Sequence, residues 1–328
     1  QGLEIWPLAV LGGLVFTVPQ MLIAVLVGPE LPTLLGSLIG LPLFILLVRK
    51  KVFTPKESWD FPPHSQWPRE WEGEIRAGDK PLNIRPEMSV LRAWMPYVIV
   101  GAVLLLSRVQ AFGLTPLLRQ WSIGWEEILD TSIGRAIQPL YNPGVFPFLV
   151  VALLIPFIHK IRFGETLQAF KETFHMIVPA SVALVFTLGM VYIMMETGEA
   201  TRMDSMLIVL AKAAASVAGS VWYVVAPFVG AMGTFISGSN TVSDIMFGPF
   251  QYSTARTAEI APAPILALQA VGGAAGNMIA IHNVVAALTT VGLIGREGVI
   301  IRKNIWVCLG YCLLAGIVGW ILSGIFLT

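Results

Sequence analysis

A cluster of polar side chains interrupts an otherwise apolar part of the sequence, between residues 233 and 248. This stretch reads GTFISGSNTVSDIMFG, and the apolar segments 221–232 and 245–250 flank its polar centre. Buried hydroxyls and unpaired backbone groups are costly inside a bilayer, so they persist where they line a cavity or bind something. We therefore expect a re-entrant hairpin over residues 221–250, with a non-helical turn at 237–241 at mid-depth in the membrane. A Ser/Gly-rich loop at the membrane surface is the alternative interpretation.

A second interruption lies in the apolar segment 265–293, where GGAAGN occupies residues 272–277. A Gly-rich break in a membrane helix exposes backbone carbonyl and amide groups at mid-depth. Paired discontinuous segments of this kind point to the binding site of a transporter. The sequence therefore predicts a broken helix over 265–293, with the break at 272–277 close to the tip of the hairpin. The alternative is that the glycines are packing sites for neighbouring helices.

Together these two elements offer groups that bind a small carboxylate without a fixed cation. Ser, Thr and Asn side chains donate and accept hydrogen bonds, and helix N-termini that restart after each interruption direct a partial positive charge at an anion. A monocarboxylate with a hydroxyl group suits such a pocket, while the same oxygen atoms can instead hold Na⁺. The candidate substrate-binding residues are Ser237, Gly238, Ser239, Asn240, Thr241, Ser243, Gly273, Gly276 and Asn277.

Coupling of transport to protons requires a titratable group inside the membrane. Three residues are candidates for this role: Asp244, beside the polar cluster; His282, in the helix that follows the break; and Glu196, after the apolar segment 175–195. Histidine titrates near physiological pH, although a lone membrane histidine can equally be a hydrogen-bonded packing residue.

The composition identifies an integral membrane protein. The 328 residues are 55% hydrophobic and 12% charged, with a mean hydropathy of +0.75, which excludes an ordinary soluble domain. The net charge of +1 creates no electrostatic field that favours binding of nucleic acid. Cys308 and Cys312 are expected to fill space as small apolar groups, since a metal site needs more ligands.

The start of the sequence lacks the basic region of a cleavable signal peptide. We expect the sequence to begin partway through a longer protein.

The predicted fold is an all-α polytopic membrane protein with about seven spanning helices, one re-entrant hairpin and one broken helix. We expect residues 1–48 to form a two-helix hairpin from the preceding repeat, 49–92 a cytoplasmic loop, and 93–328 the C-terminal transport repeat. The loop and the segments 159–162 and 296–303 are rich in Lys and Arg, which places all three on the cytoplasmic side if the hairpin does not cross. Residues 164–174 are expected to form a short amphipathic helix before the span 175–195.

Three stretches of the sequence resemble the L-lactate permease family: GPELP at 28–32, GTFISGSNTVSDIMFGPFQ at 233–251 and GGAAGNMIAIHNVVAALTTVGLIGREG at 272–298. The resemblance extends over nearly the whole chain but only over the later part of the family's length. It implies uptake of lactate, and often glycolate, by proton symport in the plasma membrane. The Ser-Asn-Thr signature is also similar to the wider ion-transporter superfamily, whose inverted repeats carry such residues at hairpin tips. This likeness implies that Ser239, Asn240 and Thr241 lie at the substrate or ion.

The chain departs from the family pattern at two positions. Asp244 stands where the family usually has Asn, and Ser237 stands where Thr is usual. The resemblance therefore implies that coupling or the preferred substrate charge differs in this chain. A first repeat is not evident, and transporters of this type bind between repeats.

The sequence as a whole indicates a secondary transporter of small monocarboxylates in the plasma membrane, with H⁺ or Na⁺ and membrane lipid as partners and no cofactor. A Na⁺-coupled carboxylate carrier and a non-transporting membrane subunit are the alternatives. An enzyme is disfavoured, because the sequence shows no metal-ligand cluster, phosphate loop or nucleophile–base pair with recognisable spacing.

Overall fold

The computed structural model describes residues 2–29, 31–55, 60, 62–67, 88–109, 112–125, 135–201, 203–290, 293 and 295–326. Most of the predicted cytoplasmic loop 49–92 lies outside these residues. The chain divides into two compact units, one made of Gln1–Pro63 and Leu82–Lys171 and the other of His64–Pro81 and Glu172–Thr328. Each unit has its own internal packing.

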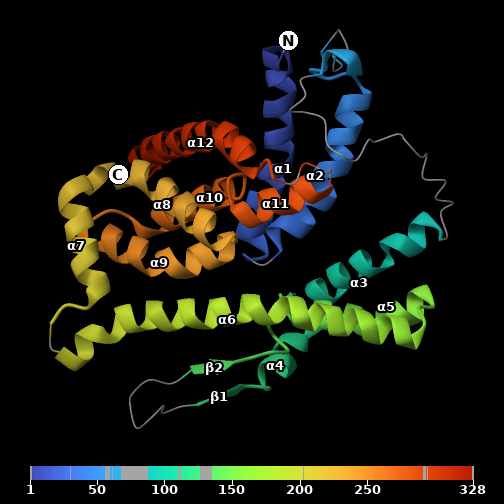
Figure 1. Cartoon of the computed structure of the whole chain (residues 1–328), viewed down its shortest axis with the longest axis horizontal. Coiled ribbons are helices and arrows are strands. Elements are labelled where there is room, and N and C mark those ends of the chain that lie inside the picture. Colours follow the sequence, from blue (N-terminus) through green and yellow to red (C-terminus); the bar gives the residue numbers. More distant parts are fainter. Residues whose placement is uncertain are drawn as a thin grey trace. The chain divides into compact units, whose positions relative to one another are not determined.

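The first unit is built from two helix pairs and a small strand hairpin. Helix α1 packs against α2 (Figure 1), where Gly36 and Gly40 of α2 lie directly against Gln20 and Phe16 of α1. Small residues at such a contact let two backbones approach closely. The elements of this unit are η1 (Gly2–Ile5), α1 (Trp6–Leu26), α2 (Pro32–Arg49), α3 (Val90–Arg108), α4 (Leu114–Arg119), the antiparallel strands β1 (Ile123–Trp125) and β2 (Arg135–Ile137), and α5 (Phe146–His159).

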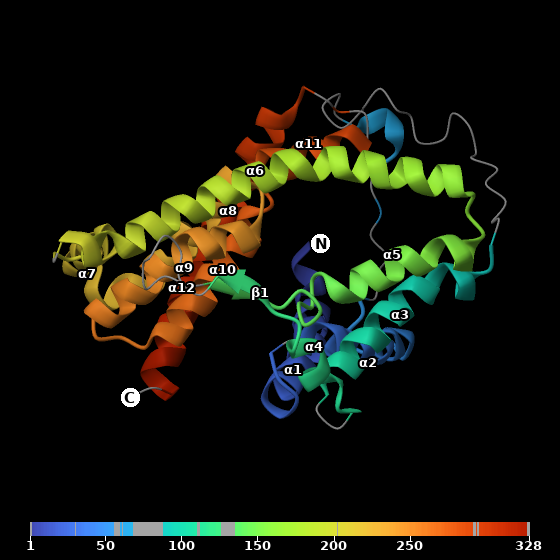
Figure 2. The same ribbon diagram turned by 90° about the horizontal axis from the view of Figure 1, so that it is seen from below.

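The second helix pair of this unit, α3 and α5, lies side by side in Figure 2. Arg92 in the first turn of α3 donates to the carbonyl oxygen of Ile158 at the end of α5, with Nε at 2.8 Å. His159 returns a contact, since its Nε2 lies 3.1 Å from Arg92 O. The two helices are therefore antiparallel, and a cation satisfies the carbonyl end of α5.

The second unit is centred on α8, α9 and α10, which pack against one another, with α12 against α8 and α10. In the segment Pro262–Thr289, half of the most apolar stretch is buried, whereas in Glu297–Ile325 only 17% of the most apolar stretch is buried. Helix α10 is therefore the core of this unit. Its elements are η2 (His64–Gln66), α6 (Phe163–Thr201), α7 (Met206–Ala218), η5 (Gly219–Val221), α8 (Trp222–Ser237), α9 (Asn240–Thr257), α10 (Pro262–Gly276), α11 (Ile281–Thr290) and α12 (Glu297–Phe326), with α6 beginning in the first unit.

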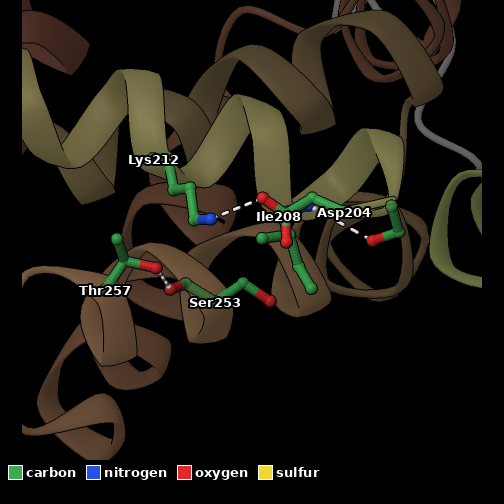
Figure 3. Close-up of polar contacts among 6 residues, drawn as sticks. Asp204, Ile208, Lys212, Ser253 and Thr257 are labelled. Atoms are coloured by element: carbon green, nitrogen blue, oxygen red, sulfur yellow. Dashed lines mark hydrogen bonds and ion pairs between the residues drawn. The ribbon is translucent and has the colours of Figure 1, made fainter. Parts of the chain in front are cut away.

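Helix α7 packs on α9 and carries one basic side chain, Lys212. The backbone N–H of Ile208 donates to Ser205 Oγ at 3.3 Å, which caps the start of α7. Figure 3 shows that Lys212 pairs with Asp204, just before this cap. The charge of Lys212 is thus matched by a carboxylate next to its own helix.

The all-α polytopic fold is confirmed, since the described residues are helical apart from turns, connecting segments and two three-residue strands. The prediction of separate helices at 164–174 and 175–195 is wrong, because α6 is one continuous helix of 39 residues. Within the described residues, five segments are long and apolar enough to span a membrane: Trp6–Leu26, Pro32–Arg49, Val90–Arg108, Pro262–Thr289 and Glu297–Ile325.

Candidate functional site

Two residues, Gly238 and Ser239, join α8 to α9 and form the tip of a helical hairpin. Gly238 has a φ of +74°, the left-handed conformation that ends many helices and that glycine adopts without strain. Ser239 caps α9, because its Oγ accepts from the backbone N–H of Val242 at 3.4 Å. Ser237 braces the turn: its Oγ donates to Gly233 O at 2.8 Å and accepts from Ser239 N at 3.3 Å. The observed turn is therefore shorter than the expected 237–241.

The two arms of the hairpin run antiparallel. Ser243 Oγ donates to Gly230 O at 2.8 Å near the tip, and Gln251 Nε2 donates to Ala226 O at 3.1 Å farther along. Helix α9 continues to Thr257, so the second arm is longer than the expected 245–250.

The interruption between α10 and α11 covers residues 277–280. The prediction that the break begins at Gly272 is wrong, because residues 272–276 form the last turns of α10. The interruption nevertheless lies against the hairpin tip, as expected. A Cβ placed on Gly238 would be 2.9 Å from His282 Nδ1. Asn283 Nδ2 donates to Asn277 Oδ1 at 2.8 Å and lies 3.5 Å from Gly238 O.

The glycines of α10 allow close packing between helices. This is the interpretation that the sequence offered as the alternative to a helix break at 272–277. A Cβ on Gly272 would lie 1.9 Å from Pro227 O, and one on Gly276 would lie 2.5 Å from Ala231 O. A Cβ on Gly230 of α8 would in turn lie 2.1 Å from Gln269 O. The backbones of α8 and α10 therefore approach too closely for any side chain at these positions.

Two helix N-termini meet at the tip. Helix α9 begins at Asn240 and α11 at Ile281, and the contacts of Gly238 with His282 and Asn283 bring these two starts together. The first N–H groups of a helix have no partner within the helix, and the helix dipole adds a partial positive charge there. Thr241 and His282 are exposed beside these N–H groups. The arrangement suits a small anion that also has a hydrogen-bonding group.

A second group of polar atoms faces the interior of the hairpin, and we call it the acceptor cluster. It consists of Thr234 Oγ1, Asn240 Oδ1 and Asp244 Oδ1, which are buried and have no hydrogen-bond partner within the part of the chain that the structure describes. A Cβ on Gly273 would lie 1.9 Å from Asn240 Oδ1 and 3.2 Å from Thr234 Oγ1. Asp244 is one helical turn after Asn240, on the same face of α9.

A chain of hydrogen bonds, which we call the glutamine network, links α8, α9 and α10 next to this cluster. Trp222 Nε1 donates to Gln251 Oε1 at 2.7 Å, and Gln251 Nε2 donates to Gln269 Oε1 at 2.8 Å. Gln269 Nε2 then donates to Ser243 Oγ at 3.1 Å and lies 3.3 Å from Ser243 O. All four side chains are buried. Satisfied networks of this kind hold a core in one arrangement.

The structure separates the remaining predicted site residues into those at the tip and those elsewhere. Ser243 is fully buried in the glutamine network, and Gly276 is buried against α8. Glu196 lies on α6, and no described contact joins it to the tip. Asn277 is at the tip through its bond to Asn283.

Sequence reasoning missed four residues of this region: Thr234, Gln251, Gln269 and Asn283. One signal was available, because Gln269 is the single polar side chain in residues 262–271 and a polar group in an apolar membrane helix faces the protein interior. Nothing in the sequence spacing indicated which of these residues meet.

The two fully buried threonines of the hairpin provide a test of the acceptor cluster. In a buffer without added metal ions, Thr234→Val is expected to leave the free energy of unfolding unchanged or raise it by about 1 kcal/mol, since it removes an unpaired buried hydroxyl. Thr254→Val is expected to lower it by about 1 kcal/mol, because Thr254 Oγ1 donates to Phe250 O at 2.9 Å. Denaturant unfolding of both variants checks this. Equal destabilisation would show that Thr234 Oγ1 has a partner.

Comparison with known proteins assigns the chain to a protein family. The profile of the L-lactate permease family matches residues 2–326. The chain belongs to the L-lactate permease family. It is 30% identical to a relative from Haemophilus influenzae over 321 residues, which are 92% of this chain and 56% of the relative. No solved structure shows a significant match.

Two further members of the L-lactate permease family have named substrates. The chain is 25% identical to the L-lactate permease of Bacillus subtilis, over 93% of this chain and 57% of that protein. It is 23% identical to the glycolate permease of Escherichia coli, over 96% of this chain and 58% of that protein. The chain thus spans little more than half the length of the relatives it matches. Membership of this family and its apolar helices identify it as a multi-pass plasma-membrane protein.

Proposed function

We propose that this chain supplies a substrate site of a secondary transporter for small monocarboxylates, L-lactate or glycolate, driven by proton symport. The observation that carries the proposal is the meeting of the α9 and α11 N-termini at Gly238. Aligned helix starts offer free N–H groups and partial positive charge to a carboxylate without binding it as tightly as a buried arginine does. A site that must release its substrate benefits from such moderate binding.

In this proposal, different residues at the tip bind the carboxylate and the 2-hydroxyl group of the substrate. The N–H groups at the start of α9 and the His282 ring receive the carboxylate. Thr241 and the Asn277–Asn283 pair offer donors and acceptors for the 2-hydroxyl group. The N–H groups of Asn240 and Thr241 are the α9 donors in this proposal, because the N–H groups of Ser239 and Val242 donate to Ser237 Oγ and Ser239 Oγ.

The position of the hairpin in the membrane is part of the same proposal. Helices α8 and α9 enter and leave the bilayer on one side, so the tip at Gly238–Ser239 lies at mid-depth. The antiparallel arms and the two-residue turn support this. Unpaired acceptors such as Asn240 Oδ1 are tolerated at that depth where the surrounding protein, rather than lipid, covers them.

Asp244 is the proposed site of the coupled proton. Its carboxylate is on α9 one turn from Asn240, inside the acceptor cluster. An ionised carboxylate so close to the tip repels an anionic substrate, so protonation must come before substrate binding. The order of binding is therefore proton first and monocarboxylate second. His282 is the second candidate for the coupling group and Glu196 the third, although neither belongs to the cluster.

A transporter fits the chain better than an enzyme does. The named relatives are permeases, and the described residues contain no group of three His, Cys, Asp or Glu side chains that could hold a catalytic metal. A hairpin tip placed against a helix interruption is the arrangement found at transporter sites. A non-transporting membrane subunit has no need of it.

Uptake measurements test the proposal. The purified protein in proteoliposomes is expected to accumulate labelled L-lactate when the outside is more acidic, with no chemical change to the lactate. A Na⁺ gradient at equal pH on both sides is expected to drive little uptake. Accumulation driven by Na⁺ alone would replace proton symport with the Na⁺-coupled alternative. Conversion of lactate to another compound would overturn the transporter assignment.

Replacing His282 tests the substrate site itself. His282→Gln is expected to weaken L-lactate binding about ten- to hundredfold, because a hydrogen bond to a charged group contributes roughly 1.5–3 kcal/mol. His175→Gln on the exposed surface of α6 is the matched control, and it should bind normally. Isothermal titration with L-lactate at constant pH gives both affinities. An unchanged affinity in the His282 variant would remove this residue from the site.

A further inference from the structure

A cavity of about 410 Å³ lies at the base of the α8–α9 hairpin, at the end of both arms away from the tip. Three parts of the second unit line it: the start of α8, the link between α9 and α10, and the last turns of α12. Its volume is within the range of pockets that bind small molecules. None of the residues assigned to the substrate site belongs to this lining, so the cavity is a separate feature of the unit.

Two hydroxyl groups of the lining are available to a ligand. Tyr223 on α8 and Ser323 on α12 line the cavity although the two residues are only 6% and 8% exposed. Neither hydroxyl has a hydrogen bond to another residue in the part of the chain that the structure describes. Polar groups with so little contact to water normally have a partner. Both hydroxyls can accept a hydrogen bond from an N–H donor.

Glu259 gives the cavity a negative charge. It follows the end of α9, and it is the single charged side chain among the residues of the lining. No described residue forms an ion pair or a hydrogen bond with its carboxylate. Arg256 precedes it by three residues in the last turn of α9, but the two side chains do not form an ion pair. The cavity therefore favours a cation.

The backbone at Glu259 shows that a glutamate is an unusual choice for this position. Its φ is +56°, directly after the last residues of α9. The N–H of Ile260 donates to Ala255 O at 3.0 Å and the N–H of Glu259 to Arg256 O at 3.3 Å, which is a common way for a helix to end. Glycine is the usual residue there, because a side chain is strained in the left-handed conformation. A strained carboxylate in the lining of a cavity points to ligand binding.

Trp320 and Ile321 bring the cavity to the membrane surface. They lie near the end of α12, which is long and apolar enough to span a membrane, and tryptophan is enriched where such helices leave the bilayer. Trp320 is 53% and Ile321 49% exposed, so acyl chains can lie beside this part of the lining. The ring of tryptophan also attracts cations. The matching ligand is thus cationic at one end and apolar at the other.

We propose that this cavity binds the primary ammonium headgroup of a membrane lipid such as phosphatidylethanolamine. Glu259 pairs with the ammonium group, and the hydroxyls of Tyr223 and Ser323 accept its N–H groups. A trimethylated headgroup has no N–H to donate, and an anionic headgroup is repelled by the carboxylate. The site requires neither the transported substrate nor the proposed role of Asp244.

Thermal unfolding of the purified protein in detergent tests the choice of lipid. Added phosphatidylethanolamine is expected to raise Tm, because a ligand that binds only the folded state stabilises it. Phosphatidylcholine and phosphatidylglycerol with the same acyl chains are expected to raise Tm less, and free ethanolamine at the same concentration to have no effect. Equal responses to the three lipids would overturn the proposal. A response to free ethanolamine as large as that to phosphatidylethanolamine would overturn the assignment to a lipid.

Replacing the carboxylate locates the site. Glu259→Gln keeps the size of the side chain and is expected to weaken the affinity for phosphatidylethanolamine about five- to tenfold. The dependence of Tm on lipid concentration gives this affinity. Glu165→Gln, at an exposed position in the first turn of α6, is the matched control, and it should bind the lipid as the wild type does. An unchanged affinity in the Glu259 variant would overturn the proposal.

Glu259→Gly separates lipid binding from folding. In detergent without added lipid, its Tm is expected to equal or exceed that of the wild type, since glycine adopts the left-handed conformation without strain. Its Tm is also expected to respond little to phosphatidylethanolamine. A lower Tm combined with a wild-type response to the lipid would show that Glu259 serves the fold and would overturn the proposal. None of these measurements involves lactate, so their failure would leave the proposed transport function intact.

Discussion

Gly272→Ala is expected to lower the free energy of unfolding by about 3 kcal/mol or more. The new Cβ would lie 1.9 Å from Pro227 O and 2.5 Å from both Pro227 C and Cα. These are backbone atoms of α8, which cannot rotate away as the end of a side chain can, so α8 and α10 must separate. The separation also strains the glutamine network that joins the same helices. Denaturant unfolding in detergent measures the loss.

A glycine in open space is the matched control for this change. Gly310→Ala in α12 places its Cβ at a position with no atom within 4 Å. Alanine is the better helix former by about 1 kcal/mol, so this variant is expected to be as stable as the wild type or slightly more stable. If both variants unfold alike, the close contact between α8 and α10 does not exist in the protein.

Asp244→Asn is expected to abolish most of the pH dependence of lactate uptake while preserving substrate binding. Above the pKa of a required acid, the protonated fraction falls about tenfold per pH unit, so wild-type uptake should decline steeply as the external pH rises. Asparagine stays neutral at every pH and does not repel the anion, so the variant should bind L-lactate without first taking up a proton. Initial uptake rates over a range of external pH, in sodium-free buffer, show the difference.

Asp204→Asn is the control for the removal of a carboxylate, because Asp204 lies outside the hairpin and pairs with Lys212. It is expected to retain the wild-type pH profile. A wild-type profile in the Asp244 variant would exclude Asp244 as the coupling acid and transfer the role to His282. Loss of lactate binding in that variant would instead mean that the carboxylate positions the substrate site.

Local chemistry was sufficient to predict the hairpin turn, because its determinants are adjacent in the chain. Gly238 supplies the left-handed residue that ends α8, and Ser239 supplies the cap that starts α9. The sequence did not reveal how short the turn is. Asn240 and Thr241 are helical because Ser239 Oγ accepts from the backbone N–H of Val242, so the cap starts α9 directly after the turn.

The glycines of α10 show where local reasoning fails. Glycine lowers helix propensity, so residues 272–277 were expected to break the helix. Packing outweighs this cost, since Gly272 and Gly276 let α10 lie against the backbone of α8, and the interruption falls at 277–280 instead. The partner helix, and not the glycine itself, decides whether such a residue breaks a membrane helix.

Hydropathy and family signatures were enough to identify a multi-pass membrane protein of the L-lactate permease family, because both are properties of the residues in order along the chain. The glutamine network and the acceptor cluster emerged only from the folded arrangement. Thr234, Asn240 and Gly273 lie on three different helices, and helical periodicity specifies which residues share a face but not which faces meet. That pairing depends on close packing between helices distant in the sequence, and it places buried oxygens side by side where the sequence shows single polar residues scattered through apolar segments.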